Sequence, residues 1–177
     1  MNKEIKKLIL ELCKNQKWNW KNHIELVVKW SKKLARQLNA DEDVCETAAW
    51  LHDIKKLKGE KEEHHIRGAE EAWQILQRLK YPKKKIQQIT YCILTHSSDK
   101  KYSPKTKEAK IVASADALAQ FETFLLFTYY VYAIKKDSKE EGRQWLIRKY
   151  QKNLNKLMPE AKKIALPKYK MIKYMLK

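Results

Sequence analysis

Residues 48–54 have the sequence Ala48-Ala49-Trp50-Leu51-His52-Asp53-Ile54, an apolar stretch that ends in an adjacent histidine and aspartate. Apolar residues recur at three- to four-residue spacing from Val44 onward, which predicts a helix whose last turn carries the His-Asp pair. Asn39 or Asp41 can cap the start of this helix. Imidazole nitrogens and carboxylate oxygens together are the usual ligands of Zn, Mn, Fe, Co and Ni. The end of the helix is therefore predicted to bear part of a metal site.

The other candidate ligands lie far from this pair in the sequence. The five histidines all fall in one stretch, at His23, His52, His64, His65 and His96. Asp116 follows in an otherwise apolar run, where an unpaired buried carboxylate would be costly. The successive spacings are 29 residues from His23 to His52, one from His52 to Asp53 and 63 from Asp53 to Asp116, a pattern too widely spread for a zinc finger or knuckle. Only a folded bundle could unite these residues in one site.

The chain is predicted to be all-α, a helical bundle with a basic helical extension at the C-terminus. Three glycines and four prolines among 177 residues are too few for a turn-rich sandwich or barrel, and no strand-like alternation recurs. Apolar periodicity predicts helices near residues 8–12, 24–38, 44–53, 69–79, 86–96 and 109–134, with Pro82 in the first turn of the fifth. We place the metal-binding domain at residues 1–135 and the extension at 136–177.

The charge of the chain favours anionic partners. Thirty-nine Lys and Arg against 21 Asp and Glu give a net charge of +18, and residues 135–177 hold 14 basic and four acidic residues, or +10 of that total. Lysines beside Trp145, Tyr150, Tyr169 and Tyr174 could neutralise and stack single-stranded nucleic acid, or form the solvated face of packed helices. A nucleotide-sized substrate attracted by the same charge is favoured somewhat over nucleic acid.

Cysteine usage and apolar segments bear on the compartment. Cys13, Cys45 and Cys92 are widely separated and form no C-x-x-C motif, which fits a reduced cytoplasm. No signal peptide is expected, because Met1 to Leu10 mixes lysines with few apolar residues. Residues 111–134 contain only Asp116 and Glu122 as charges, so a membrane span is an alternative. A core helix explains the same apolarity and tolerates a liganded aspartate, so we expect no membrane partner; its aromatic residues would pack the core or a homodimer face.

The pattern of an early His, a His-Asp pair and a late Asp resembles the HD-domain superfamily of metal-dependent phosphohydrolases. Residues 48–54 are similar to the family's apolar helix closing in His-Asp-Ile, although Lys55 stands where a glycine is frequent before the lysine at position 56. Residues 64–70 resemble the His-x-x-x-Gly-Ala segment of members that bind two metals, and residues 95–97 their next histidine. Residues 108–118 resemble the stretch with the final Asp, although Ser114 replaces an additional acid. The resemblance covers about residues 22–119.

This resemblance implies a helical bundle that hydrolyses a nucleotide or another small phosphate mono- or diester. It implies one or two divalent ions (Mn, Fe, Co, Ni, Zn or Mg), and the chemistry would be attack by metal-activated hydroxide on phosphorus. The implied first-metal ligands are His23, His52, Asp53 and Asp116. His64, favoured over His65 by its spacing to Gly68, and His96 would hold a second ion, with Asp53 as the bridging and catalytic residue.

Lys56 and Arg67 are predicted to bind phosphate oxygens. The alternative is a non-catalytic nucleic-acid-binding protein that keeps the same scaffold, to which the Lys55 and Ser114 departures lend weight.

Overall fold

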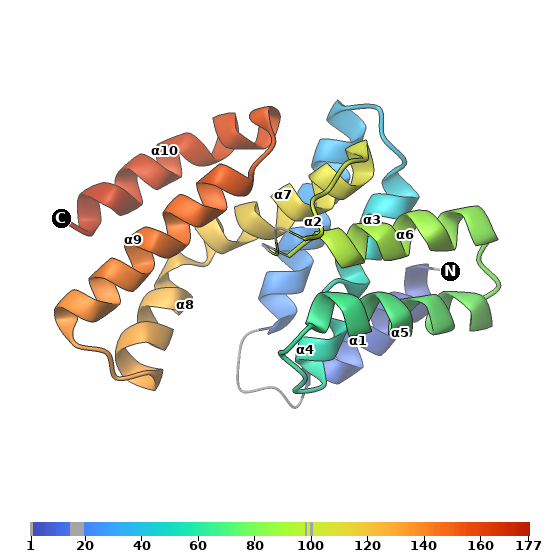
Figure 1. Cartoon of the computed structure of the whole chain (residues 1–177), viewed down its shortest axis with the longest axis horizontal. Helices are drawn as coiled ribbons and strands as arrows, with labels where there is room; N and C mark the ends of the chain where they lie inside the picture. Colours follow the sequence, from blue (N-terminus) through green and yellow to red (C-terminus); the bar gives the residue numbers. More distant parts are fainter. Residues whose placement is uncertain (1, 15–19, 98, 100) are drawn as a thin grey trace. The chain divides into compact units, whose positions relative to one another are not determined.

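The computed structural model describes residues 2–14, 20–97, 99 and 101–177, and the prediction of an all-helical protein is confirmed because no strand occurs in these residues. Figure 1 shows the helices in chain order. They are α1 (Asn2–Cys13), α2 (Trp20–Gln37), α3 (Glu42–Leu51), α4 (Ile54–Leu57), α5 (His64–Arg78), α6 (Lys83–Thr95), α7 (Lys107–Glu122), α8 (Phe124–Tyr129), the π-helix η1 (Tyr130–Ile134), α9 (Lys139–Lys156) and α10 (Pro159–Met175).

The chain divides into two compact units, an N-terminal unit (Met1–Asp116) and a C-terminal unit (Ala117–Lys177). This division falls inside α7, whereas the sequence analysis placed a boundary after residue 135. The predicted limits of the two domains, residues 1–135 and 136–177, stay a prediction.

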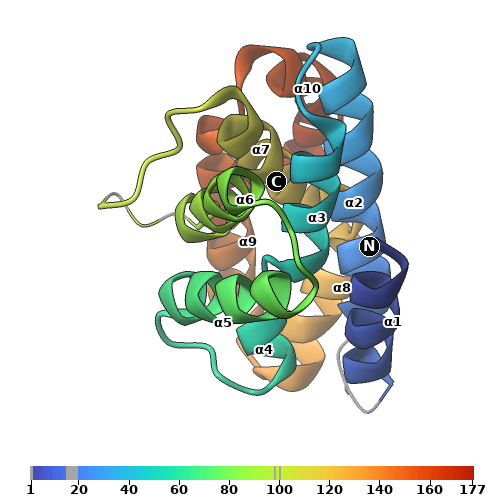
Figure 2. The same cartoon turned by 90° about the vertical axis from the view of Figure 1, so that its right-hand side faces the viewer.

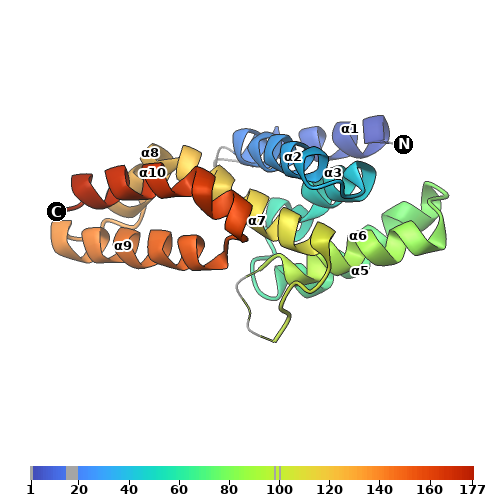
Figure 3. The same ribbon diagram turned by 90° about the horizontal axis from the view of Figure 1, so that it is seen from above.

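Helix α3 forms the centre of the N-terminal unit. Its residues from Thr47 to Leu51 are all buried, and it packs against α1, α2 and α6. The Asp41 carboxylate caps its start by accepting a hydrogen bond from the Val44 backbone N–H at 3.1 Å. Helices α5 and α6 lie side by side, as Figures 2 and 3 show, and α4 packs against α5. The His-Asp pair thus leaves α3 at a point to which α2, α5 and α6 also bring side chains.

Two elements differ from those predicted. The one-turn helix α4 lies between the predicted helices 44–53 and 69–79, where no helix was predicted, and the buried Ile54 and Leu57 anchor it. The apolar stretch 109–134 is broken at Thr123, whose hydroxyl donates to the Ala119 carbonyl at 3.1 Å and shares that acceptor with the Thr123 backbone N–H at 3.2 Å, a pattern that often bends helices. No single described helix is long and apolar enough to cross a membrane, and α7 with the α8–η1 segment meets the criteria only as a pair bent by 71°.

The C-terminal unit consists of the end of α7 followed by α8, η1, α9 and α10. Helices α9 and α10 lie side by side (Figures 1 and 3). Tyr150 is fully buried, and its hydroxyl donates to the Gln120 carbonyl at 3.0 Å. Ser138 and Glu141 form a capping box at the start of α9. Gly142 lets α9 approach η1, because an added Cβ would overlap Tyr132 and lie 2.6 Å from Val131 Cγ1.

Candidate metal centre

Six predicted ligands come together within the N-terminal unit, and all except Asp116 lie at or near helix ends. His23 lies in the first turns of α2, His52 directly follows α3, His64 begins α5 and His96 directly follows α6. Asp53 links α3 to α4, and Asp116 lies on α7. All except His64 are buried. Because a helix end lets a side chain project past its own backbone, several helices can supply one centre without crossing.

The Asp53 carboxylate is shared by two groups of histidines. Its Oδ2 lies 3.4 Å from His52 Nε2 and 3.8 Å from His23 Nε2. Its other oxygen, Oδ1, lies 3.4 Å from His96 Nε2 and 3.7 Å from His64 Nε2. Within each group the ligand atoms all lie within 4.8 Å of one another. One oxygen thus faces each group, which is the arrangement of a carboxylate that can bridge two ions.

Asp116 extends the first of these groups. Its Oδ1 lies 3.5 Å from His23 Nε2, and the residue is 7% exposed. The first group therefore offers two imidazole nitrogens and two carboxylates, and the second offers two imidazole nitrogens and the shared Asp53. Both sets are mixed nitrogen and oxygen donors, which suit transition metals.

Backbone carbonyls orient three of the four rings. Nδ1 of His52 lies 2.7 Å from the Ala49 carbonyl, and Nδ1 of His96 lies 2.6 Å from the Ile93 carbonyl. Nδ1 of His64 lies 3.1 Å from the Lys61 carbonyl. A carbonyl oxygen only accepts, so each Nδ1 carries a proton, and in a neutral ring the lone pair that could bind a metal is then on Nε2. Hydrogen bonding of the outer ring nitrogen is the usual support of a metal-ligating histidine.

The environment keeps most of these rings neutral. Burial lowers the pKa of His23 to about 4 and that of His64 to about 3, and it also lowers the pKa of His96. Burial acts in the same direction on His52, but the Asp53 carboxylate outweighs it and raises the pKa of His52. Metal ligands must be deprotonated, so His23, His64 and His96 are prepared to bind at neutral pH.

The residues present fit a divalent ion. Nε2 of His52 is fully buried and makes no hydrogen bond of standard geometry within the described chain. A buried polar atom without a partner is costly, and an ion coordinated by Nε2 removes that cost.

The model of the HD domain family matches residues 20–120. This chain belongs to that family. The crystal structure of YpgQ from Bacillus subtilis is similar in fold, with a TM-score of 0.76 at 18% identity over 97% of this chain and 90% of that one. The crystal structure of YpgQ in complex with ADP has a TM-score of 0.75 at 19% identity over 98% of this chain and 90% of that one. A predicted HD superfamily hydrolase from an uncultured Thermotogales bacterium has a TM-score of 0.62 at 21% identity, over 84% of each chain. A search of curated proteins gave no match.

Lys56 is the cation at the centre of this HD domain. Its Nζ lies 2.9 Å from Asp53 Oδ1 and 3.2 Å from Asp53 Oδ2. Burial would raise the pKa of Asp53, but Lys56 and His52 outweigh it and hold that pKa well below its ordinary value. Burial would likewise lower the pKa of Lys56, and the Asp53 carboxylate raises it instead. Both groups are therefore charged at neutral pH.

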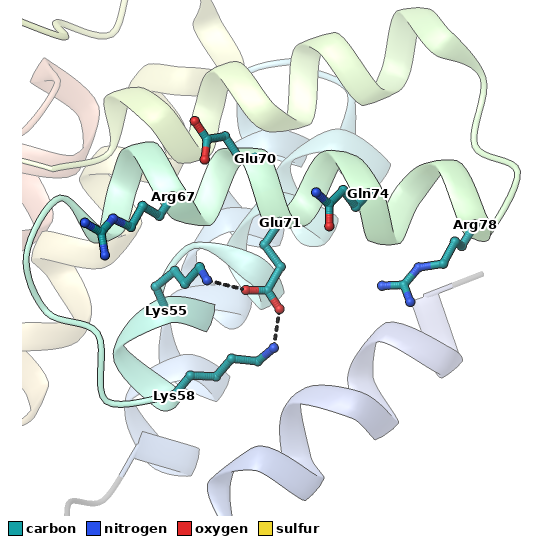
Figure 4. Close-up of a pocket in the computed structure, with 7 residues that line it drawn as sticks. All are labelled: Lys55, Lys58, Arg67, Glu70, Glu71, Gln74 and Arg78. Atoms are coloured by element: carbon teal, nitrogen blue, oxygen red, sulfur yellow. Dashed lines mark hydrogen bonds and ion pairs between the residues drawn. The ribbon is translucent and has the colours of Figure 1, made fainter.

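Arg67 lies elsewhere in the HD domain. It lines a surface groove of about 500 Å³ with Lys55 and Lys58, which both pair with Glu71 (Figure 4). The Arg67 guanidinium lies 3.5 Å from Glu60, and no described contact joins it to the six ligands. Lys55, at the position of the family's glycine, is held by Glu60 at 3.0 Å and points into this groove. The phosphate-binding role of Arg67 stays a prediction that its placement does not favour.

His65 is a buried residue that the sequence analysis set aside. Its ring packs edge-on against His64 at 5.4 Å and against Tyr102 at 5.5 Å between centroids. Its Nε2 lies 3.5 Å from Asp99 Oδ2, outside both histidine groups. His64, rather than His65, is the one that faces Asp53. No periodic pattern in the sequence marks Asp99 or Tyr102, because both lie in the connection between α6 and α7.

Proposed function

We propose that this chain is a binuclear metal-dependent phosphohydrolase that acts on a nucleotide or a similar small phosphate. Family membership supports metal-dependent phosphohydrolysis at the level of the superfamily. The single observation that carries the two-ion form is the Asp53 carboxylate, which turns one oxygen to each histidine group. Divalent ions supply an acidified water and positive charge against the phosphoryl oxygens.

The protein's own residues have distinct tasks in this proposal. Asp53 would hold both ions at a fixed separation, and His23, His52 and Asp116 would complete the first site. The neutral His64 and His96 rings would complete the second. Lys56, whose side chain is 27% exposed, can reach a phosphate at the rim of the centre.

Two observations support a nucleotide as the substrate class. YpgQ, which shares the fold over most of both chains, has been crystallised in complex with ADP. The net charge of +18 would draw a polyanion toward the protein.

The first test is the replacement of each central carboxylate by its amide. Asp53→Asn and Asp116→Asn are expected to lower metal-stimulated nucleotide hydrolysis by about a thousandfold or more, since each removes charge that holds an ion. Metal content, measured by elemental mass spectrometry, should fall in parallel while the helical circular dichroism remains. Glu160→Gln, the same chemical change on exposed α10, is the matched control. Undiminished turnover in either aspartate variant would refute the proposal.

The second candidate, a non-catalytic nucleic-acid-binding protein, rests on the charge of +10 over residues 135–177. The structure gives its predicted stacking residues other tasks. Tyr150 is buried in the core, and Trp145 packs against Tyr130 and beneath Lys149. Among the four aromatic residues predicted to stack on nucleic acid, Tyr174 is the one whose side chain is exposed. This candidate requires steeply salt-dependent oligonucleotide binding that survives Asp53→Asn.

A further inference from the structure

The Lys56 ammonium and the two histidine groups converge on the same two oxygen atoms. Asp53 Oδ1, at 2.9 Å from Nζ, is the oxygen that faces His64 and His96. Asp53 Oδ2, at 3.2 Å from Nζ, is the oxygen that faces His23 and His52. The Asp53 side chain is 2% exposed, so its charge is poorly screened by water. One lysine thus contacts both oxygens that the two ions would need.

The backbone beneath Lys56 is fixed, whereas its side chain can move. Helix α4 is anchored by buried Ile54 and Leu57. Lys55 and Lys58, which precede and follow Lys56, are held by ion pairs with Glu71. Lys56 follows Asp53 by three residues, which places its ammonium over the carboxylate on the same helical turn. Its four-carbon stem has several rotatable bonds and is partly exposed, so the ammonium can leave without any change in α4.

A divalent ion and this ammonium repel each other at so short a range. An ion bound to Asp53 would lie about 2.0–2.2 Å from a carboxylate oxygen, with the ammonium on the same group. Like charges that share a buried carboxylate disfavour each other strongly, because little water is present to screen them. The two cations therefore compete for Asp53.

We infer that Lys56 is an internal counter-ion that competes with the divalent metal for Asp53 and is released toward the substrate side when the metal binds. This inference rests on the proposed function, since it takes the two histidine groups as metal sites. It sets an order of events in which the metal binds before the phosphate. The released ammonium then gains a phosphate oxygen as its partner in place of the carboxylate.

The test is a calorimetric titration of chelator-treated, dialysed full-length protein with Mn²⁺. Lys56→Gln removes the competitor and is expected to tighten Mn²⁺ binding by about tenfold or more. Lys56→Arg keeps the charge and adds a fork that pairs well with a carboxylate, so it should weaken Mn²⁺ binding. Lys58→Gln, the same loss of charge next to the same short helix but paired with Glu71, is the matched control and should bind as the wild type does.

Thermal unfolding provides a second readout. Without metal, Lys56→Gln leaves the buried Asp53 carboxylate without its cation and should melt below the wild type. Saturating Mn²⁺ should raise its melting temperature by more than it raises that of the wild type. Circular dichroism will show whether each variant is folded. If Lys56→Gln does not fold, the Mn²⁺ affinity of Lys56→Arg decides whether the lysine competes with the metal.

The outcomes separate this inference from the proposed function. If the wild type binds Mn²⁺ and Lys56→Gln binds it no more tightly, the inference that Lys56 competes with the metal is refuted, while the proposed function is not. Absence of Mn²⁺ binding by the wild type overturns both.

Discussion

The two units of this chain differ in which side chains they bury: buried polar residues lie mostly in the N-terminal unit, and exposed large hydrophobic residues lie mostly in the C-terminal unit. Of the eleven polar or charged residues found buried, ten lie in the N-terminal unit, and Asn153 is the exception. Of the eight large hydrophobic residues found exposed, seven lie in the C-terminal unit. Burial of a polar group costs free energy unless a partner or an ion compensates it. Five of the ten buried polar residues in the N-terminal unit are candidate metal ligands, whose burial a bound ion would compensate, whereas the described part of the C-terminal unit buries one polar side chain.

After the loss expected for the two aspartate variants, the next largest effect tests the role of the buried histidines in the N-terminal unit. His64→Ala and His96→Ala should each lower the metal content from about two ions per chain to about one, since each removes a ligand of the second group. Hydrolysis should fall by about a hundredfold or more. Elemental mass spectrometry and steady-state turnover measure the two effects.

His65→Ala is the matched control, because this neighbouring buried histidine faces Asp99 rather than Asp53. It should retain about two ions. A wild-type content of about one ion that neither His64→Ala nor His96→Ala changes would show a mononuclear site.

The next effect tests whether the C-terminal unit serves packing alone. Tyr150→Ala deletes a fully buried ring and should lower the free energy of unfolding by about 3–5 kcal/mol. Tyr150→Phe removes only the hydroxyl that donates to the Gln120 carbonyl and should cost about 1 kcal/mol. Urea denaturation measures both. The folded variants should keep the wild-type metal content, and a loss of ions in Tyr150→Phe would break the contrast between the units.

The last effect, no larger than that of Tyr150→Ala, is the dependence of stability on pH in metal-free protein. The folded pKa of His23 is about 4, against an ordinary value of 6.5, so the unfolded chain binds the proton more tightly. Stability is then fully present above pH 6.5 and is lost as the pH falls toward 4, by about 3 kcal/mol for this residue. His64 and His96, with lowered pKa values, act in the same direction, while His52, with a raised pKa, opposes them.

Residues 117–177 contain no histidine, and the pKa of Glu140 there is about 2, so this region has little to titrate in the same window. Urea midpoints at pH 7 and pH 4.5 provide the measurement. His23→Gln should reduce the difference between them. A wild-type midpoint that does not change over this range would contradict the burial of neutral histidines.

Much of the site could be predicted because its ligands are encoded by residue type at fixed places in a family pattern. His23, His52, His64, His96 and the two aspartates all converge. The contact of Lys56 with Asp53 was not predicted, because the sequence does not reveal that α4 is helical and turns position 56 back over position 53. Arg67 lines the groove with its guanidinium 3.5 Å from Glu60, and a pairing of this kind depends on how the chain between α4 and α5 folds. The break at Thr123 was missed because apolar periodicity continues across it.

The hydrogen bonds that orient His52, His64 and His96 all run to the carbonyl three residues earlier in the chain. Every amino acid has that carbonyl, so the ring orientation does not depend on which side chains occupy positions 49, 61 and 93. Substitutions there leave the acceptor in place, whereas inserting or deleting one residue before His52 or His96 would shift the ring relative to its helix end. The orientation of the ligands therefore constrains the length of α3 and α6 far more than their sequence, and it can persist through extensive sequence divergence.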